Sequence, residues 1–303
     1  MKRLLLGTAL GLFLGVTGQA KADYMFRRLD PPDSSRTEAL GINSYGHIVG
    51  NYEDGNHIRH GFLLIGDCYT PFDVPSSTLT GASGINDSDE IVGRYLDAGG
   101  IQHGYKRLTD GSSYERLPDP PDGTSLQPYA INNSGRIVGW YVDADGIQHG
   151  FLLSEGQYTR TDPPFSTQTF AEGINNFGII VGAYRVADRA RGYVRLSGGR
   201  FIYPPDPEPE SMLTNAIGIN DLGQISGSFI DSRSIRHGFV LEYGQYTPLD
   251  PPEGINIYAS GINASGWIVG QYTEAATPRV HGYLATPVPE PGPGAPPNRL
   301  GAQ

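Results

Sequence analysis

The chain has 303 residues, and its 32 acidic and 22 basic side chains give it a net charge of −10. This acidic balance disfavours nucleic acid and anionic lipid as partners, because both are polyanions. Cys68 is the only cysteine, so an intramolecular disulfide is excluded. Its position beside a strand aromatic predicts a small buried thiol.

The first 22 residues have the composition of a secretory signal peptide. Lys2 and Arg3 precede an apolar stretch, and Ala20-Lys21-Ala22 supplies small residues at a cleavage site. We therefore predict a secreted, cell-surface or periplasmic protein, with a retained N-terminal anchor as the alternative. Cleavage would remove three positive charges, shift the net charge to about −13 and leave no membrane span.

From residue 41 to residue 272 the chain repeats one pattern six times. An Ile-Asn pair is followed by a short polar turn and, in most copies, by an Ile-Val-Gly run. A period of about 40 to 50 residues predicts a repeat architecture, in which each unit buries its apolar face against its neighbours. The copies begin at Gly41, Gly84, Ala130, Gly173, Gly218 and Gly261, at steps of 43, 46, 43, 45 and 43 residues.

The fifth repeat has the composition of four short strands. Residues 216–220 and 224–229 flank a tight turn, 237–241 follow a looser connection, and 245–249 end at Asp250-Pro251-Pro252. Four hairpin-connected strands in about 44 residues are typical of a propeller blade. We predict an all-β, six-bladed β-propeller over residues 23–286, nearly free of helix and monomeric. A parallel β-helix is the alternative, although its coils are normally shorter.

The two ends of the repeat region complement each other. The last repeat has no fourth strand after residues 281–285, whereas residues 26–32 match residues 246–252 position for position. We therefore predict that the N-terminal strand completes the last blade and closes the ring, which leaves no unpaired sheet edge there. Residues 287–303 are rich in Pro and Gly and predict a disordered tail.

Aromatic residues and histidines recur in fixed columns of the repeat. Occupancy in every blade is what packing between blades requires, so we assign three aromatic columns to the core. One column of histidines precedes Gly in five blades; we interpret it as structural hydrogen bonding, with a metal site as the alternative. The histidines are His60, His103, His149, His237 and His281, and Arg191 replaces them in the fourth blade.

The sequence predicts no cofactor and no metal. Asp143-Ala144-Asp145-Gly146 is similar to the start of a calcium loop, but its counterparts after Asp97 and Asp231 lose the second acid. We interpret it as a hairpin turn and keep Ca²⁺ as the alternative. Known catalytic motifs, such as G-x-S-x-G or H-E-x-x-H, are absent from the sequence.

Side chains that differ from blade to blade are better candidates for a binding site, because packing does not demand them. Inner segments such as Ala82-Ser83 and Ala171-Glu172 hold mostly small residues, which favours binding over catalysis. The candidate binding residues are Trp140, Trp267, Arg191, His57 and His47.

The pattern Ile131-Asn132-Asn133-Ser134-Gly135-Arg136-Ile137-Val138-Gly139, followed by His149-Gly150-Phe151, resembles the HAF repeats of bacterial extracellular proteins. The resemblance covers nearly the whole chain after residue 22 and implies secretion and a repeat body, without a settled activity. Here Gly stands where the family name has Ala. Val288-Pro289-Glu290-Pro291 resembles the opening of a PEP-CTERM sorting signal, although the membrane helix and basic cluster of that signal do not follow.

The sequence is compatible with two functions. The first is a secreted or cell-surface module that binds a glycan or an extracellular or envelope protein. The second is an extracellular propeller hydrolase or lyase that acts on polysaccharide or a cyclic ester, with its site at one mouth of the channel.

Overall fold

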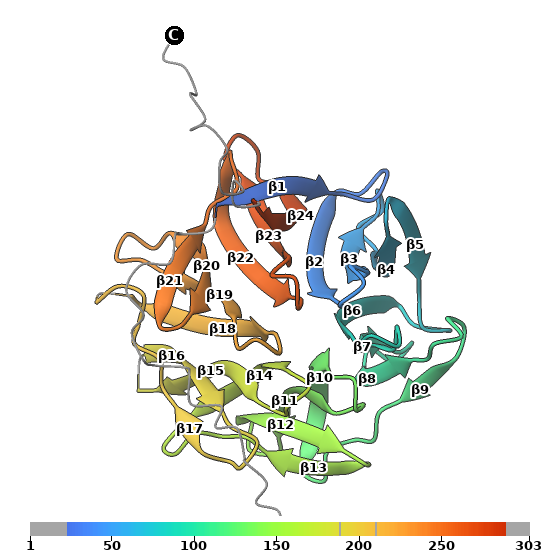
Figure 1. Ribbon diagram of the computed structural model, residues 1–303. Coiled ribbons are helices and arrows are strands. Elements are labelled where there is room, and N and C mark those ends of the chain that lie inside the picture. Colours follow the sequence, from blue (N-terminus) through green and yellow to red (C-terminus); the bar gives the residue numbers. More distant parts are fainter. Residues whose placement is uncertain (1–22, 188, 210, 289–303) are drawn as a thin grey trace, which may run out of the picture.

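The computed structural model describes residues 23–187, 189–209 and 211–288, and every regular element in them is a β-strand. The 24 strands form six antiparallel units of four around a central axis, which we call blades (Figure 1). Four of these units are separate sheets, and a single parallel pair, Ala190 with Leu213, joins the other two into one eight-stranded sheet. The predicted all-β propeller is therefore confirmed. None of these residues belongs to a helix long and apolar enough to cross a membrane. The predicted signal peptide and nearly all of the predicted tail lie outside the described residues.

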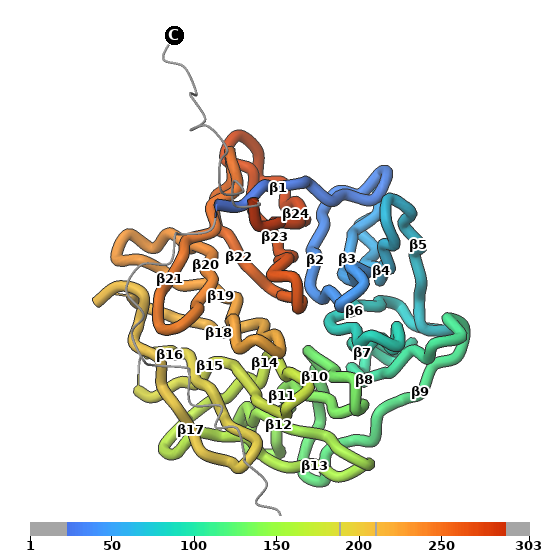
Figure 2. Tube along the Cα trace, viewed as in Figure 1, coloured from blue at the N-terminus to red at the C-terminus, as the bar shows by residue number. Residues whose placement is uncertain are grey.

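Each blade runs from an inner strand beside the axis to an outer strand at the rim (Figure 2). Blade 1 consists of β2 (Arg36–Ile42), β3 (Ile48–Glu53), β4 (Arg59–Ile65) and β5 (Cys68–Phe72). Blade 2 consists of β6 (Leu79–Ile85), β7 (Ile91–Leu96), β8 (Gln102–Arg107) and β9 (Tyr114–Arg116). Blade 3 consists of β10 (Gly123–Ile131), β11 (Ile137–Asp143), β12 (Gln148–Ser154) and β13 (Gln157–Arg160). Blade 4 consists of β14 (Gln168–Ile174), β15 (Ile180–Val186), β16 (Arg189–Arg195) and β17 (Phe201–Ile202). Blade 5 consists of β18 (Leu213–Ile219), β19 (Ile225–Ile230), β20 (Arg236–Glu242) and β21 (Gln245–Leu249). Blade 6 consists of β22 (Gly254–Ile262), β23 (Ile268–Glu274), β24 (Val280–Pro287) and β1 (Tyr24–Leu29).

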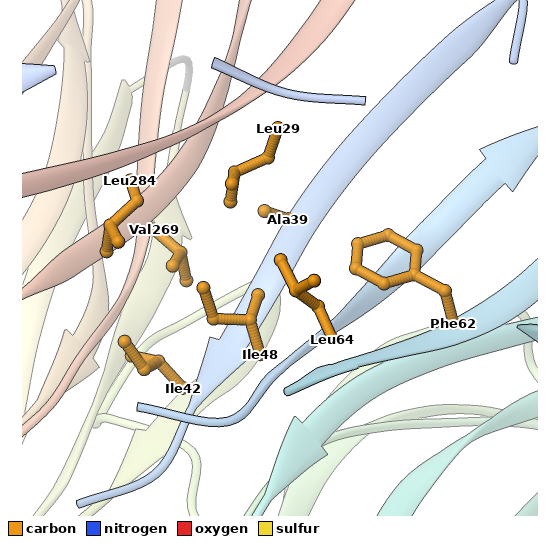
Figure 3. Packing of buried hydrophobic residues seen from close by; sticks show 8 residues of the cluster. All are labelled: Leu29, Ala39, Ile42, Ile48, Phe62, Leu64, Val269 and Leu284. Atoms are coloured by element: carbon orange, nitrogen blue, oxygen red, sulfur yellow. The ribbon is translucent and has the colours of Figure 1, made fainter. Parts of the chain in front are cut away.

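The strand that completes blade 6 comes from the other end of the chain. β1 pairs antiparallel with β24, from Tyr24 opposite Pro287 to Leu29 opposite Gly282. This is the predicted ring closure, and β24 reaches one residue beyond the predicted boundary at 286. The core continues across the seam between blades 6 and 1, because Leu29, Val269 and Leu284 pack with residues of β2, β3 and β4 (Figure 3).

The aromatic columns fill the space within and between blades, as predicted. The aromatic of the third strand is fully buried in every blade, and the partly buried aromatics of the second and fourth strands pack beside it. Burial of such rings is worth about 2–3 kcal/mol each. The column consists of Phe62, Tyr105, Phe151, Tyr193, Phe239 and Tyr283.

The prediction for Cys68 is wrong, because its side chain is exposed. Cys68 begins the outer strand β5 at the rim, where Tyr69 is half-buried, Phe72 is buried and the other residues are exposed. Tyr69 takes the packed position, so the residue before it points outward.

The histidine column is tied to aspartates of the same blade. Nδ1 of His149 lies 2.6 Å from Asp162, and its Nε2 lies 2.9 Å from Asp143. His60 and His103 make one such bond each, at 2.8 and 3.0 Å. These bonds join the third strand to the loops on either side of it, which supports the structural interpretation of the column.

Candidate ligand-binding site

A channel follows the axis of the propeller and holds a cavity of about 270 Å³. The inner strands of all six blades surround it (Figure 1). Since side chains alternate along a strand, one residue in two of each inner strand faces the axis. The ring of positions just before the Gly-Ile or Ala-Ile pair contributes Leu40, Ser83, Tyr129, Glu172, Ile217 and Ser260 to the wall.

One end of the channel is encircled by a ring of asparagines, which lines a second space of about 80 Å³, and we call this end the Asn face. Nδ2 of each asparagine donates to the backbone oxygen of the asparagine in the next blade, and the last one, Asn263, donates to Asn43 at 3.1 Å. Each Oδ1 accepts two N–H groups of its own turn, as Asn132 does from Ser134 and Arg136. The sequence explained this column by turn capping, and the bonds between blades are an additional finding. The ring consists of Asn43, Asn86, Asn132, Asn175, Asn220 and Asn263.

The opposite end, which we call the channel mouth, is built from residues that differ from blade to blade. Two residues before the wall ring, the inner strands carry Glu38, Gly81, Gln127, Phe170, Asn215 and Tyr258. Their register partners on the second strands are Asn51, Arg94, Trp140, Ala183, Ser228 and Gln271. Cross-strand partners share a face of the sheet, so both sets lie at the same end of the channel. Asn215, Tyr258 and Gln271 among them line the channel cavity. The residues at the Asn face are therefore the same in every blade, whereas those at the channel mouth differ from blade to blade.

Glu172 is the carboxyl group inside the channel wall. Burial raises the pKa of Glu172 to about 8, and the charge of Arg236 acts in the opposite direction. Among the described residues Glu172 has no salt-bridge partner, although the cavity gives its side chain partial access to solvent. The group is therefore mostly protonated at neutral pH, and it can both donate and accept a hydrogen bond.

Two tyrosines flank the channel mouth. Burial, followed by the proximity of Glu172, raises the pKa of Tyr129 to about 12. Tyr258 lies under Arg236, whose Cζ is 4.3 Å from the centre of the ring. A guanidinium over an aromatic face is held by a cation–π interaction, so this arginine has a fixed position.

Glu38 is the second carboxyl group near the channel mouth, and it is bound on all sides. Its Oε1 accepts from Arg36 at 2.7 Å, and its Oε2 accepts from Asn51 at 3.2 Å and lies 3.5 Å from Arg59. Burial acts to raise the pKa of Glu38, but Arg59 and Arg36 outweigh burial and lower it. This carboxylate is ionised and already has its partners.

A side pocket of about 210 Å³ opens between blades 4 and 5. It shares Tyr129, Glu172 and Asn215 with the channel cavity, so the two spaces meet at these residues. Ala183 lines the pocket at the position where blade 3 has Trp140. The small side chain on β15 therefore creates the space that the larger one fills on β11.

The five residues singled out from the sequence do not form one cluster. Trp140 belongs to the channel mouth, where its ring centre is 6.2 Å from that of Phe170. Arg191 replaces the histidine of its column and lies 3.9 Å from Asp206, far out along its blade. His57 is exposed in the hairpin between β3 and β4, with a positive φ of 62°.

The other two predicted residues lie on turns of the Asn face. Nδ1 of His47 is 2.8 Å from Asp89 of the next blade, and Trp267 borders Gly46, whose Cβ position is 3.1 Å from the indole. The corresponding turns of four successive blades carry exposed large apolar side chains: Phe177, Leu222, Trp267 and Tyr45.

Sequence reasoning missed Arg94, Arg236, Gln271 and Tyr258. Trp140 was found because it is conspicuous, yet Arg94 and Gln271 occupy the same column. The variation of this column from blade to blade could have identified these residues, because it holds Asn, Arg, Trp, Ala, Ser and Gln in successive blades. The expectation of mostly small residues along the channel also missed that Tyr129 and Glu172 face the axis.

The calcium alternative concerned the loop at Asp143. Its Oδ1 accepts the N–H groups of Asp145 and Ile147, both at 2.9 Å, and its Oδ2 faces His149. Asp97 and Asp231 make the same bonds in their hairpins. Hydrogen bonding within the hairpin thus accounts for the carboxylate, and Ca²⁺ at this loop stays a prediction.

No family model matches the chain, and no curated protein matches it either. Comparison with solved structures returns β-propellers. A protein described as a gluconolactonase has 16% identity and a TM-score of 0.52, over 92% of this chain and 94% of that one. The β-propeller domain of the trilobed protease from Pyrococcus furiosus has 9% identity and a TM-score of 0.52, over 83% and 95%.

A lectin of Aleuria aurantia, solved as a mutant in complex with Fucα1-6GlcNAc, has 13% identity and a TM-score of 0.53. The match covers 86% of this chain and 99% of the lectin. At these identities the likeness concerns the fold alone. The chain is a β-propeller, and its chemistry has to be argued from its own channel mouth.

Proposed function

We propose that this protein is an exported binding module that takes a glycan at the channel mouth. The observation that carries the proposal is the contrast between the two ends of the channel. Packing and closure explain the uniform Asn face, whereas nothing in the fold requires six unlike side chains at the other end. Ligand sites are concave and combine apolar walls with a few placed polar groups.

The side chains at the channel mouth match the surface of a sugar ring. Tyr129 and Tyr258 line the cavity and can contact the C–H groups of a pyranose, with one face of Tyr258 covered by Arg236. Asn215 and Gln271 offer amides to its hydroxyl groups. Oε1 of Gln271 is buried without a hydrogen-bond partner in the described part of the chain, so it is a free acceptor. The channel cavity and the side pocket provide separate spaces that meet at Glu172.

An extracellular or envelope protein is a second candidate partner, and a separate surface favours it. Phe177, Leu222, Trp267 and Tyr45 expose apolar side chains on neighbouring turns of the Asn face. Contiguous exposed apolar side chains are typical of protein contact surfaces. This candidate therefore uses the opposite face of the disc from the glycan site.

Hydrolysis or elimination of a polysaccharide or cyclic ester is the alternative function. The protonated Glu172 favours it, because such a group can give its proton to a leaving oxygen while water adds to the other fragment. A second, free carboxylate would have to activate that water. Glu38 is engaged by Arg36, Arg59 and Asn51, so the channel mouth is better equipped for binding than for catalysis.

A glycan array with matched variants on the two faces tests the proposal. Tyr258→Ala removes an aromatic from the channel mouth, and Tyr45→Ala removes one from the Asn face. We expect the wild type and Tyr45→Ala to bind the same glycans and Tyr258→Ala to lose about tenfold or more in affinity. Loss of binding in Tyr45→Ala alone, or no glycan binding by the wild type, would refute the proposal.

The same glycans, incubated with the protein and assayed for new reducing ends and for unsaturated products, test the alternative. Turnover that Glu172→Gln abolishes would establish catalysis. Intact glycans with retained binding would leave the binding function alone.

A further inference from the structure

We infer that the ligand of the channel mouth is anionic, and that it is a uronate-bearing oligosaccharide whose carboxylates pair with Arg94 and Arg236. This inference rests on the proposed function and names its class of ligand. Three observations carry it: two arginines without acidic partners, a local excess of positive charge, and neutral groups suited to the rest of a sugar.

Arg94 and Arg236 are half-buried and have no salt-bridge partner among the residues that the structure describes. Nη1 of Arg94 donates to Gln102 at 2.9 Å, and Nη1 of Arg236 donates to Ser228 at 3.0 Å. A guanidinium has five N–H donors, so most donors of each remain free. A half-buried cation without a counter-ion costs free energy unless a ligand supplies the charge.

The fold leaves room for these side chains at the channel mouth. Arg94 lies beside its register partner Gly81, whose Cβ position is 3.8 Å from Cγ of the arginine. Glycine replaces the larger residues found at this point in other blades, and the side chains of Asn51 and Arg94 both approach the position that a Cβ would occupy, at 3.2 and 3.8 Å. Burial and the nearby Arg59 lower the pKa of Arg94, and they outweigh the opposing influences of Tyr129 and Glu38.

Glu38 and Glu172 are the acids nearest to these arginines, and neither forms a salt bridge with Arg94 or Arg236 in the described part of the chain. Glu38 is shared by Arg36 and Arg59, and Glu172 carries a proton at neutral pH because it is buried. Arg185 adds a third guanidinium at the rim of the side pocket, again without a salt bridge in the described part of the chain. A chain with a net charge of −10 thus has a positive centre at one end of its channel.

The surrounding hairpins are acidic, yet their carboxylates are occupied. Oδ1 of each accepts backbone N–H groups of its own turn, and Oδ2 of three of them faces a histidine of the same blade. At the rim these carboxylates favour a cation over an anion. Inside the channel mouth the field is set mainly by the charges that line it, because a cleft focuses their field. They are Asp54, Asp97, Asp143 and Asp231.

The remaining groups distinguish a sugar acid from a simple anion. A lone carboxylate or phosphate would use the arginines and nothing else. Tyr129 and Tyr258 provide ring faces, and the unpartnered Oε1 of Gln271 provides an acceptor for a hydroxyl group. Since the channel cavity and the side pocket meet at Glu172, the ligand can occupy both with successive residues.

Calorimetric titration with matched ligands tests the inference. The probes are oligogalacturonate and oligomannuronate, each compared with its carboxyl-reduced, neutral counterpart of the same length. We expect the uronates to bind the full chain about tenfold or more tightly than their neutral counterparts. We also expect this preference to shrink as salt rises from about 50 to about 200 mM, because salt screens charge pairs.

Substitutions locate the charge recognition. Arg94→Gln and Arg236→Gln should each weaken uronate binding about tenfold or more, and lysine at the same positions should restore part of the loss. Arg116→Gln is the matched control, since Arg116 is exposed on β9 and pairs with Asp119. Thermal melts verify that every variant is folded, and Arg236→Gln serves if Arg94→Gln does not fold.

The outcomes separate the inference from the proposed function. Equal or tighter binding of the neutral oligosaccharides overturns the inference and leaves glycan binding intact. Uronate binding that neither folded arginine variant alters also overturns it. No binding of either class refutes the inference and, together with a blank glycan array, the proposed function as well.

Discussion

Nδ1 of His281 lies 2.8 Å from Oδ2 of Asp30, a pair separated by 251 positions in the chain. The histidine side chain is fully buried on β24, and the aspartate directly follows β1. This hydrogen bond therefore joins the first and last strands of the protein, beside the backbone ladder that closes the ring.

We predict that His281→Ala lowers the free energy of unfolding by about 2–4 kcal/mol, because it leaves a cavity at the closure and removes one of the two side-chain partners of Asp30, the other being Arg28. His60→Ala is the control, since His60 makes the equivalent 2.8 Å bond to Asp73 within a blade of continuous chain and is partly exposed. It should cost about 1 kcal/mol. Denaturant titration measures both, and equal losses would contradict a special role for the closure.

A chain that begins at residue 33 instead of residue 23 should lose far more stability. It lacks β1, so β24 exposes a whole unpaired edge and Leu29 leaves the core between blades 6 and 1. We expect its melting temperature to fall on the order of 10 °C or more, measured by circular dichroism. An unchanged melt would show that the ring does not depend on this strand.

Asn132→Asp tests the asparagine ring with almost no change of shape. The aspartate can still accept the N–H groups of Ser134 and Arg136, but it cannot donate to the backbone oxygen of Asn175. We expect a loss of about 1–3 kcal/mol, because a buried carbonyl oxygen loses its donor and faces a carboxylate. Asn132→Ala removes these three bonds and the one that Oδ1 accepts from the Ser134 hydroxyl, and it should cost at least as much in the same denaturant titration. A neutral effect of Asn132→Asp would mean that the ring contributes no stability.

The pH dependence of stability should reveal Glu172. Its pKa is about 8 in the folded protein and near the ordinary 4.5 in the unfolded chain, so the unfolded chain binds fewer protons between these values. Stability therefore falls as pH rises from about 4.5 to about 8 and is level above that. Tyr129 lines the same cavity, but its pKa is raised to about 12, above this range.

Glu172→Gln should remove this slope and gain on the order of 2 kcal/mol over the wild type at pH 8. Glu38→Gln gives the opposite sign, because the pKa of Glu38 is lowered by its arginines. Its wild-type contribution is present above the unfolded pKa and is lost as pH falls. Unfolding curves at several pH values decide, and parallel curves for Glu172→Gln and the wild type would contradict the assignment.

Ala183→Phe should fill the side pocket between blades 4 and 5. The pocket volume of about 210 Å³ admits a phenyl ring, so we expect the fold to remain and glycan affinity to fall about tenfold or more. Ala183→Ser is the matched control, since blade 5 carries Ser228 at this position. Titration calorimetry measures the affinities. Undiminished binding by Ala183→Phe would confine the ligand to the channel cavity.

The parts of this molecule that repeat could be predicted from the sequence. The match of residues 26–32 with residues 246–252 predicted the pairing of β1 with β24, because both stretches are the same element of one unit. The aromatic columns were assigned to packing for the same reason, and Phe62 and Tyr283 are fully buried.

The channel mouth could not be predicted in the same way. Arg94 and Tyr258 lie in different blades, and only the curvature of the ring brings their strands to one axis. Strand alternation alone does not tell which of Ala171 and Glu172 faces that axis. The exposure of Cys68 depended on the same ambiguity of facing. Trp140 was recognised because it departs from its column, and Arg94 departs from it just as much.

The donor–acceptor sense of the asparagine ring has a consequence for unfolding. Every blade gives one side-chain bond to the next and receives one from the blade before, including the pair Asn263 and Asn43. A linear stack of repeats can fray from its terminal units, because each end unit has one neighbour. Here no unit is terminal, so detaching any blade breaks two bonds of the ring at once. The disc should melt as a single cooperative unit, and a protease should find no blade that opens ahead of the others.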